Sequence, residues 1–463
     1  MKKASNPMAK AFITAIGIIA VLMVLTYILS LIIPAGEYDR TIDTNGNSVI
    51  TSDSEYKNVE GGIPFFKWLM SPVLLLFAEG NGTVIAIILF LLIIGGIFEC
   101  LNKCGLIKYI LDKIVFKFEK TKYKLMAAIT FFFMFLGSFI GSFEECVPLV
   151  PIIVALSVSL GWDAFTGLGM SLLAIGCGFS AGICNPFTIG VAQKLCGLPT
   201  FSGIWLRAIS FLIIYFLLLL FLICHAKKNE NKKEEFAAKS VFIKNVSKDK
   251  ATVVFSTVMF VGLALILSSA FITVLQNYTM IIVAAMFLFA GIPAALVCKT
   301  SKKDLLSSFG KGVASVFPAV LMILMASSIK YTLVEAKILD TVLHYAVSLT
   351  ENLPRELIIL FIYIIVMIMN FFISSGSAKA VLLIPLITPL AQIYGISSQL
   401  CVLAYAFGDG FSNVMYPTNP VLLISLGLAN VSYTIWFRWT FKFQLANFIV
   451  TSLILLLGLT VGY

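Results

Sequence analysis

Long apolar stretches separated by short polar segments dominate this chain. A helix that crosses a bilayer needs about 20 apolar residues, and the chain contains a series of stretches of about that length. They are residues 11–33, 82–101, 123–143, 164–183, 204–225, 251–274, 279–298, 312–329, 355–373, 397–415 and 442–461. Because these runs are continuous instead of alternating with polar residues, they predict an all-α polytopic membrane protein and exclude a β-barrel.

Two shorter apolar stretches, residues 147–160 and 381–394, each follow a cluster of Gly and Ser. They are too short to cross the bilayer alone, so we interpret them as parts of re-entrant hairpins. Residues 105–118 and 331–349 are amphipathic, which is typical of helices that lie along the membrane surface.

The composition agrees with this fold class. The chain has 463 residues, of which 60% are hydrophobic and 12% charged, with a mean hydropathy of +1.01, whereas soluble domains carry roughly 25% charged residues. The net charge of +10 does not indicate nucleic acid, because the lysines lie in short loops between spans. We expect a multi-pass protein in the plasma membrane of a prokaryote, with lipid and a small molecule as its partners.

Two stretches repeat each other at a fixed offset. Residues 149–186, shifted by 234, lie on residues 383–420 without a gap and share 8 of 38 positions. Five of those eight are the helix-breaking residues Gly, Pro and Asn, including Asn185-Pro186 and Asn419-Pro420. Paired broken spans in the two halves of a membrane protein indicate the binding site of a secondary transporter.

Charge gives the relative orientation of the repeats. Residues 102–124 carry seven Lys against two acidic residues, whereas the corresponding residues 330–356 carry three basic and four acidic residues. The two segments are therefore expected on opposite sides, which makes the repeats inverted, with a cytoplasmic N-terminus. The expected units are a first span with an external loop (1–71), repeat 1 (72–225), a cytoplasmic basic linker (226–250), a helix pair (251–305) and repeat 2 (306–463).

The hairpins and broken helices carry the polar residues. Small residues let backbone approach a ligand closely, and a proline frees a carbonyl that, with Asn, Ser and Thr oxygens, suits Na⁺. The alternatives are small-residue packing and simple proline kinks. The expected substrate-binding residues are Ser142, Glu144, Glu145, Asn185, Thr188, Ser375, Gly376, Ser377, Lys379, Asp409, Asn413, Thr418 and Asn419. The expected cation-binding residues are Ser138, Gly141, Gly182, Asn185, Ser374, Gly410, Thr418 and Asn419.

Four ionisable residues lie in apolar surroundings, where a charge costs about 3 kcal/mol or more. At the offset of 234, Glu145 falls on Lys379, so we expect these two to face each other, with a buried ion pair as one alternative to a functional role. Glu144 and Asp409 would then be left for a cation, a proton or a substrate ammonium. Asp163, just before a span, is expected to be a helix N-cap without a role in transport.

Three motifs resemble the YfcC group of the C4-dicarboxylate anaerobic carrier (DcuC-type) family, within the ion transporter superfamily. They are Gly141-Ser-Phe-Glu-Glu145 with Pro148, Asn370-Phe-Phe-Ile-Ser-Ser-Gly-Ser377, and Phe407-Gly-Asp-Gly-Phe-Ser-Asn413 with Pro417-Thr418. The resemblance implies a dimeric elevator-type transporter for dicarboxylates, short-chain fatty acids or basic amino acids. This chain departs from the family pattern at Ala378-Lys379 and Asn419-Pro420, which lie at the expected sites.

These observations predict a secondary active transporter of a small carboxylate-bearing metabolite, coupled to Na⁺ or H⁺ or working as an exchanger. The local charge favours an amino acid, such as arginine or ornithine. A C4-dicarboxylate carrier stays open because helix N-termini hold anions, and so does a cation/proton antiporter. We expect neither an enzyme nor a cofactor or metal site, because the sequence has no nucleotide-binding loop and no zinc pattern.

Overall fold

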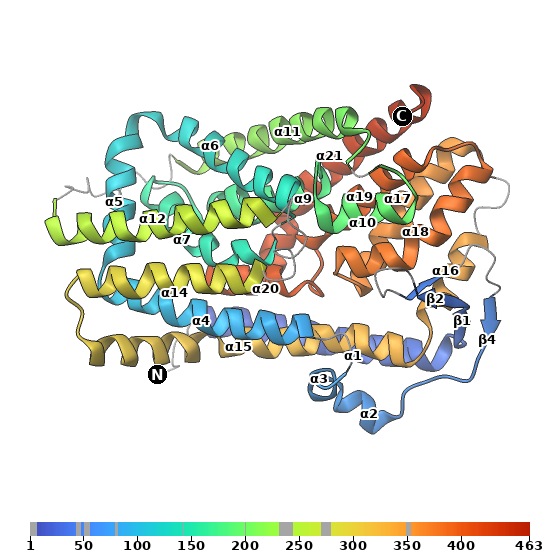
Figure 1. Cartoon of the computed structure of the whole chain (residues 1–463), viewed down its shortest axis with the longest axis horizontal. Helices are drawn as coiled ribbons and strands as arrows, with labels where there is room; N and C mark the ends of the chain where they lie inside the picture. The colour runs from blue at the N-terminus through green and yellow to red at the C-terminus, as the bar shows by residue number, and fades with distance from the viewer. Residues whose placement is uncertain are drawn as a thin grey trace.

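The computed structural model describes residues 7–42, 48–50, 56–78, 82–141, 143–199, 201–230, 244–269, 279–348 and 353–463. Within that part, 7 helices are long and apolar enough to cross a membrane, and shorter apolar helices accompany them. The chain is therefore an all-α polytopic membrane protein, as the apolar runs predict. Figure 1 shows most of these helices running along the longest axis of the molecule.

One group of helices contains no hairpin and no broken helix. It contains α1 (Pro7–Ile32), α4 (Gly82–Lys103), α12 (Val246–Ser269), α14 (Thr279–Val297) and α15 (Lys302–Glu335). Helix α15 packs on α4 and α1, and α14 packs on α4 and α12. A Cβ atom added at Gly312 would lie 2.1 Å from the carbonyl oxygen of Gly95, so α4 and α15 are in backbone contact, as small residues allow in membranes. We call these five helices the scaffold group.

The second group contains the first hairpin, the first broken helix and the helix that follows them. Its elements are α6 (Lys122–Phe135), η2 (Leu136–Ile140), η3 (Glu144–Leu149), α7 (Val150–Ser159), α8 (Ala164–Leu168), η4 (Gly169–Leu173), α9 (Ala174–Ser180), η5 (Pro186–Gly190), α10 (Val191–Leu195) and α11 (Ile204–Glu230). Hairpin 1 consists of residues 122–141 and 143–159, and its two arms meet at Gly141 and Phe143. Broken helix 1 is interrupted at residues 181–185.

The same series recurs in the C-terminal part. Its elements are α17 (Arg355–Phe372), α18 (Gly376–Ile393), α19 (Ser398–Asn413), α20 (Pro420–Leu428) and α21 (Tyr433–Thr460). Hairpin 2 consists of residues 355–393, with its tip at 373–375, and broken helix 2 is interrupted at 414–419. The two expected re-entrant stretches are thus the second arms of the two hairpins.

The two amphipathic segments lie at opposite ends of the molecule. Helix α5 (Leu106–Phe118) crosses the end where the N-terminus lies and is joined to α6 by η1 (Glu119–Thr121), whereas α16 (Leu339–Ser348) lies at the other end (Figure 1). The expected single helix over 331–349 is wrong. Helix α15 continues through this region to Glu335, and the chain turns at Lys337, whose φ is 58°. Nothing in the sequence breaks α15 at residue 330, so it is much longer than its apolar window.

Short strands form in the polar loop at residues 35–62. Strand β1 (Gly36–Tyr38) pairs with β4 (Tyr56–Asn58), and β2 (Arg40–Ile42) pairs with β3 (Ser48–Ile50), both antiparallel. The loop is attached to α16, because the backbone N–H of Tyr38 donates to Asp340 at 3.0 Å. Two short helices, α2 (Phe65–Leu69) and α3 (Ser71–Leu74), lead to α4.

Candidate substrate and ion site

The tip of hairpin 1 is bound to the break in broken helix 1. Ser138 Oγ donates to the carbonyl of Ala181 at 3.0 Å and accepts from the N–H of Ile183 at 2.9 Å. The carbonyl of Ser138 accepts from the N–H of Cys184 at 3.1 Å. Gly141 has a φ of +73°, and a Cβ atom there would lie 2.4 Å from Asn185 Oδ1. Only glycine fits this approach, which explains why the tip requires it.

Asn185 begins the second half of broken helix 1. Its Oδ1 accepts from the N–H groups of Phe187 at 2.9 Å and Thr188 at 3.3 Å, and Pro186 follows at the first helical position. This is the cap that the Asn-Pro sequence favours. Two donors are left at this helix N-terminus. Asn185 Nδ2 and Thr188 Oγ1 are buried and have no hydrogen-bond partner among the described residues.

Asn419 begins the second half of broken helix 2 in the same way. Its Oδ1 accepts from the N–H of Val421 at 3.0 Å. Its Nδ2, however, donates to Asn413 Oδ1 at 3.0 Å, so this amide is engaged. Thr418 Oγ1 is buried and lacks a partner in the part of the chain that the structure describes.

The tip of hairpin 2 reaches both broken helices. A Cβ atom added at Gly376 would lie 2.6 Å from Asp409 Oδ2 on α19 and 2.8 Å from Thr188 Cγ2 on η5. The hydroxyl of Tyr405, also on α19, donates to the carbonyl of Gly376. Ser375 caps α18 and accepts from the N–H of Ala378 at 3.5 Å. The tip therefore brings the Asp409 carboxylate close to the Thr188 end of broken helix 1.

Lys379 and Asp409 form an ion pair in the interior. Lys379 Nζ lies 2.6 Å from Asp409 Oδ1, and both side chains are fully buried. Lys379 also donates to Asn370 Oδ1 and to the carbonyl of Ile373, the latter at 3.1 Å. Asp409 Oδ2 has no hydrogen-bond partner among the residues described. One oxygen of this carboxylate is thus used by Lys379 and the other is available.

This pairing corrects one expectation from the sequence. We expected Lys379 to face Glu145 and Asp409 to be free of Lys379. The structure instead pairs Lys379 with Asp409 on the next helix of the same repeat. The fixed offset relates corresponding positions of the two repeats, but it does not report contacts between neighbouring helices within one repeat. The side chain of Glu145 lies outside the described residues.

The other expected residues surround this centre. Glu144 is half-buried in η3 and makes contacts of its own. Ser374 and Ser377 are half-buried at the tip of hairpin 2, and Ser375 is exposed. Gly182 and Gly410 are buried; a Cβ atom at Gly410 would lie 2.2 Å from Ser180 Oγ, which places the two broken helices in close contact. Ser142 lies outside the described residues.

Two polar residues of the site were not among those expected. Asn370 Nδ2 donates to the carbonyl of Asp409 and to Ser412 Oγ, both at 2.7 Å, and to Asn413 Oδ1 at 2.9 Å. Its signal in the sequence is an amide in the last turn of an otherwise apolar span. The second is Arg207 on α11.

Arg207 is fully buried and holds the first break from the other side. Its Nε donates to the carbonyl of Ile183 at 3.3 Å, and its terminal nitrogens donate to Ser202 O at 2.7 Å and Tyr463 Oη at 3.1 Å. A basic residue at the start of a predicted span resembles an ordinary interfacial anchor, so no signal in the sequence marks Arg207 as a site residue. Two of the carbonyls that the break frees, Ala181 and Ile183, are therefore already hydrogen-bonded.

Asp163 is an N-cap, as expected. Its Oδ1 accepts from the N–H of Thr166 at 2.9 Å. Its Oδ2 is bonded to His225 Nε2 at 2.9 Å and to Asn229 Nδ2 at 3.1 Å, which attaches broken helix 1 to α11. Burial alone would raise the pKa of Asp163, but the hydrogen bonds from His225 and Thr166 outweigh it and hold the pKa below its usual value.

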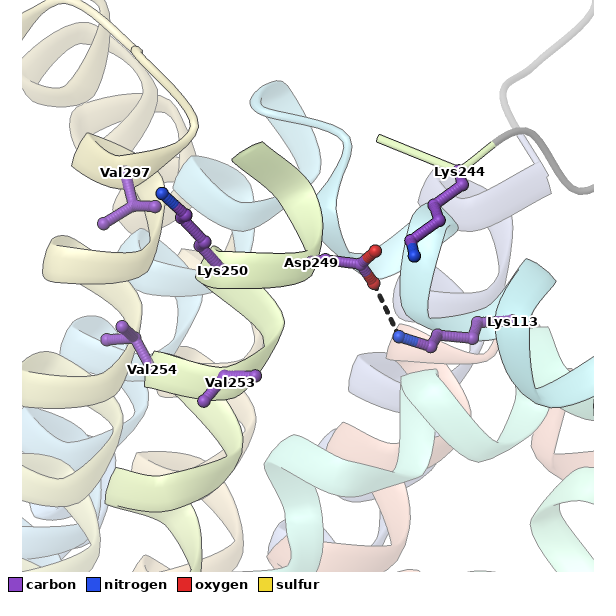
Figure 2. Close-up of a pocket in the computed structure, with 7 residues that line it drawn as sticks. All are labelled: Lys113, Lys244, Asp249, Lys250, Val253, Val254 and Val297. Carbon is purple, nitrogen blue, oxygen red and sulfur yellow. Dashed lines mark hydrogen bonds and ion pairs between the residues drawn. The ribbon is translucent and has the colours of Figure 1, made fainter. Parts of the chain in front are cut away.

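Two cavities lie away from this centre. The first, of 780 Å³, lies beside α12, and Figure 2 shows the Lys113–Asp249 ion pair, at 2.6 Å, between α5 and α12 at this cavity. A second cavity of 530 Å³ separates hairpin 1 from α12 and α14 and is lined almost entirely by apolar side chains. Neither is lined by a residue of the hairpin tips or of the breaks. Within the described residues, no group of three or more His, Cys, Asp or Glu could hold a metal.

Known proteins resemble this chain over most of its length. The putative basic amino acid antiporter YfcC of Escherichia coli K12 is 27% identical over 399 residues, which are 82% of this chain and 79% of that protein. An uncharacterized protein of Haemophilus influenzae is 25% identical over 374 residues, which are 78% of this chain and 73% of that protein.

Two solved transporter structures are also similar. The YdaH transporter of Alcanivorax borkumensis has a TM-score of 0.46 at 17% identity and covers 97% of this chain and 99% of its own. MtrF of Neisseria gonorrhoeae, from a class of antimetabolite efflux pumps, has a TM-score of 0.47 at 14% identity and covers 96% and 95%. Residues 12–460 match the sequence model of one protein family, which is described as "C4-dicarboxylate anaerobic carrier". Because this match extends over nearly the whole chain, the chain belongs to the C4-dicarboxylate anaerobic carrier (DcuC) family of membrane transporters.

Proposed function

We propose that this carrier transports an amino acid, with basic amino acids such as arginine and ornithine as its preferred substrates, and that it works as an exchanger. The substrate lies at the meeting point of the two hairpin tips and the two helix breaks. The chain is accordingly a carrier and not an enzyme.

One observation carries this proposal. Among the described residues, the Asn185 amide nitrogen, the Thr188 hydroxyl and Asp409 Oδ2 are buried without hydrogen-bond partners. Thr188 and Asp409 approach each other at Gly376, and Asn185 begins the half-helix that contains Thr188. The donors lie at the N-terminus of a half-helix, where a carboxylate is favoured. The free carboxylate oxygen suits an ammonium group. A zwitterionic amino acid satisfies both sides at once, whereas buried polar atoms without partners cost about 1–3 kcal/mol each.

The preference for a basic side chain rests on the acidic residues of hairpin 1. Glu144 is half-buried beside the tip, and Glu145 follows it in the sequence. They supply negative charge near the substrate beyond the neutral Lys379–Asp409 pair. The name of the E. coli relative, a putative basic amino acid antiporter, agrees with this preference.

Exchange is supported by the state of the first break. The carbonyls of Ala181 and Ile183 are bonded to Ser138 and Arg207, respectively. These are oxygens that a Na⁺ ion would need at the expected cation site in the first repeat. Because both carbonyl oxygens are already hydrogen-bonded, we infer that transport is driven by the gradient of a counter-transported amino acid and not by Na⁺. H⁺ is the other coupling ion that this arrangement allows.

The architecture supports an alternating-access mechanism with inverted repeats. The half-helix of repeat 1, η5 with α10, packs on α18 of hairpin 2, and the half-helix α20 of repeat 2 packs on η3 and α7 of hairpin 1. Such reciprocal packing is what a pseudo-twofold axis in the membrane plane produces. In this mechanism the scaffold group forms a homodimer, and the hairpins with the broken helices move as an elevator. A cytoplasmic N-terminus is part of this proposal, because α5, which carries three lysines, crosses the end of the molecule where α1 begins (Figure 1).

A C4-dicarboxylate is the second candidate, and the description of the family favours it. Helix N-termini can hold both carboxylates without basic side chains. The candidate would be stronger if Lys379 faced the substrate as a free cation. The ion pair with Asp409 removes that support.

The test is a thermal-shift screen of the purified protein against arginine, ornithine, neutral amino acids and C4-dicarboxylates, each in Na⁺ and in choline buffer. A ligand that binds only the folded state raises the melting temperature by mass action. Each stabilising compound is then loaded into proteoliposomes, and uptake of the labelled compound is measured with and without internal substrate. We expect stabilisation by basic amino acids, and uptake that needs internal amino acid but not Na⁺.

The outcomes separate the candidates. Stabilisation by dicarboxylates alone would make the amino-acid proposal wrong. Uptake that requires a Na⁺ gradient and no internal substrate would replace exchange by symport. Cation flux in the absence of every metabolite would favour a cation/proton antiporter.

A further inference from the structure

The ammonium group of Lys379 has the surroundings of a bound metal cation. It is contacted by three oxygens from two helices: the Asn370 side chain and the Ile373 carbonyl of hairpin 2, and Oδ1 of Asp409 on α19. Lys379 itself lies in the first turn of α18 and is fully buried. The oxygens therefore surround the head group of a side chain that enters from the opposite arm of the same hairpin.

These oxygens are the kinds that bind alkali ions in broken-helix transporters. Ile373 is the C-cap of α17, so its carbonyl lies at the negative end of a helix. Asn370 supplies an amide oxygen from the last turn, and Asp409 supplies the counter-charge. A helix C-terminus, a side-chain amide and a carboxylate together form a typical Na⁺ site, because hard cations prefer oxygen ligands.

We propose that Lys379 is a tethered cation that permanently fills the cation site of hairpin 2, so that this half of the carrier works without Na⁺. The proposal deepens the function proposed above and rests on it for the role of the site in transport. The ammonium neutralises Asp409 through Oδ1 and leaves Oδ2 for the substrate. The hydrogen bonds of Asn370 to Asp409, Ser412 and Asn413 hold the oxygens in place.

Repeat 1 has no lysine at the position that corresponds to Lys379. There Ser138 joins the hairpin to the break with a neutral hydroxyl, and Glu145 stands at the position equivalent to Lys379. The tethered cation is thus specific to hairpin 2. Removing it should leave a vacant oxygen site with one uncompensated carboxylate, which an external Na⁺ ion can enter.

The experiment compares Lys379→Ala with the double variant Lys379→Ala/Asp409→Asn and the wild type. Melting temperatures of the purified proteins are measured in NaCl and in choline chloride at equal ionic strength, without any substrate. We expect Na⁺ to raise the melting temperature of K379A saturably by ~2 °C or more. The double variant lacks both the ammonium and its counter-charge, so it should respond no more than the wild type.

The result that would overturn the proposal is a K379A variant whose response to Na⁺ equals that of the wild type and of the double variant. If K379A is too unstable for melting, its recovery as a monodisperse peak on size exclusion is compared in Na⁺ and in choline. Recovery in Na⁺ only supports the proposal. Recovery in neither buffer, while the double variant is recovered in both, would also overturn it.

This test is independent of the transported compound. Sodium alone is the probe, so a positive result stands even if the carrier moves a dicarboxylate. Conversely, amino-acid exchange by the wild type would stand even if K379A ignores Na⁺. A failure of either proposal can therefore be assigned to that proposal.

Discussion

Asn185 and Asn419 begin the two half-helices in the same way, yet of the two only Asn185 keeps an amide donor that no described residue accepts from. Each side-chain oxygen caps its own helix, whereas the amide nitrogen of Asn419 is hydrogen-bonded to Asn413. The two half-helices thus share the same side-chain cap but differ in the hydrogen bonding of the amide nitrogen. The free amide of Asn185 is a candidate ligand for the substrate, and that of Asn419 stabilises the break.

Changing these residues to aspartate should separate the two roles. Asp preserves the N-cap, and the N-terminus of the half-helix favours a carboxylate, so Asn185→Asp should change the free energy of unfolding by no more than about 1 kcal/mol. It replaces the free donor by a carboxylate oxygen and should weaken substrate binding by roughly tenfold or more, because a charged hydrogen bond contributes about 1.5–3 kcal/mol. The measurements are the melting temperature and the substrate Kd of the same preparation.

Asn419→Asp is the matched control. It also keeps the cap but puts a carboxylate against Asn413 Oδ1, so it should lower the stability by about 1–3 kcal/mol. Equal losses of affinity in both variants, with unchanged melting temperatures, would contradict this division of roles.

Gly376 should tolerate no side chain, because its Cβ atom would fall between Asp409 and Thr188. Gly376→Ala should displace one of the two and therefore abolish substrate-induced stabilisation. The overpacking should also cost about 1–3 kcal/mol of stability. Gly190 lies in the half-helix that hairpin 2 approaches, but the nearest atom to its added Cβ is 3.7 Å away. Gly190→Ala should bind substrate like the wild type, and a defect as large as that of G376A would show that any change in this region is harmful.

Ser138 is expected to hold hairpin 1 on the break. Ser138→Ala leaves the buried N–H of Ile183 without its acceptor and the buried carbonyl of Ala181 without its donor. Each group left unsatisfied costs about 1–3 kcal/mol, so the melting temperature should fall clearly. Thr130 on α6 offers a control, because its hydroxyl is buried without a partner among the described residues. Thr130→Val should therefore be neutral or stabilising, and a large loss in T130V would show that the hairpin is sensitive to any polar deletion.

The fold was largely predictable because lipid imposes a simple rule on sequence. Spans must be continuously apolar, and Asn-Pro breaks interrupt them, so both broken helices were located from the sequence. The extension of α15 past residue 330 was missed since its last turns, around Lys330, are less apolar than the span but contain no helix breaker. The strands next to Tyr38 are too short to show an alternating pattern.

Part of the geometry of the candidate site was predictable. Asn185, Thr188, Gly376 and Asp409 were among the expected residues, and the structure brings Thr188, Gly376 and Asp409 together, with Asn185 at the start of the half-helix that holds Thr188. The partner of Lys379 was not predictable, because it depends on the packing of α18 against α19 and not on the symmetry of the repeats.

Asp163 is expected to stabilise broken helix 1 without binding substrate. Asp163→Ala removes the N-cap and the bonds to His225 and Asn229, so it should cost about 1–2 kcal/mol and leave the substrate Kd unchanged. Because the pKa of Asp163 is lowered on folding, its contribution is fully present above the ordinary Asp value of about 3.9 and is lost as the pH falls through the lower folded value.

The difference in melting temperature between wild type and D163A should therefore shrink as the pH is lowered below about 3.9. Ser301 on α15 is a simpler, exposed cap that accepts from the N–H of Asp304 at 3.1 Å. Ser301→Ala should cost less than D163A, since it removes a cap without the bonds to a second helix. A D163A protein with wild-type stability but weakened substrate binding would assign Asp163 to the transport site. The observed bonds argue against that role, because they join Asp163 to His225 and Asn229 on α11 and not to a hairpin tip.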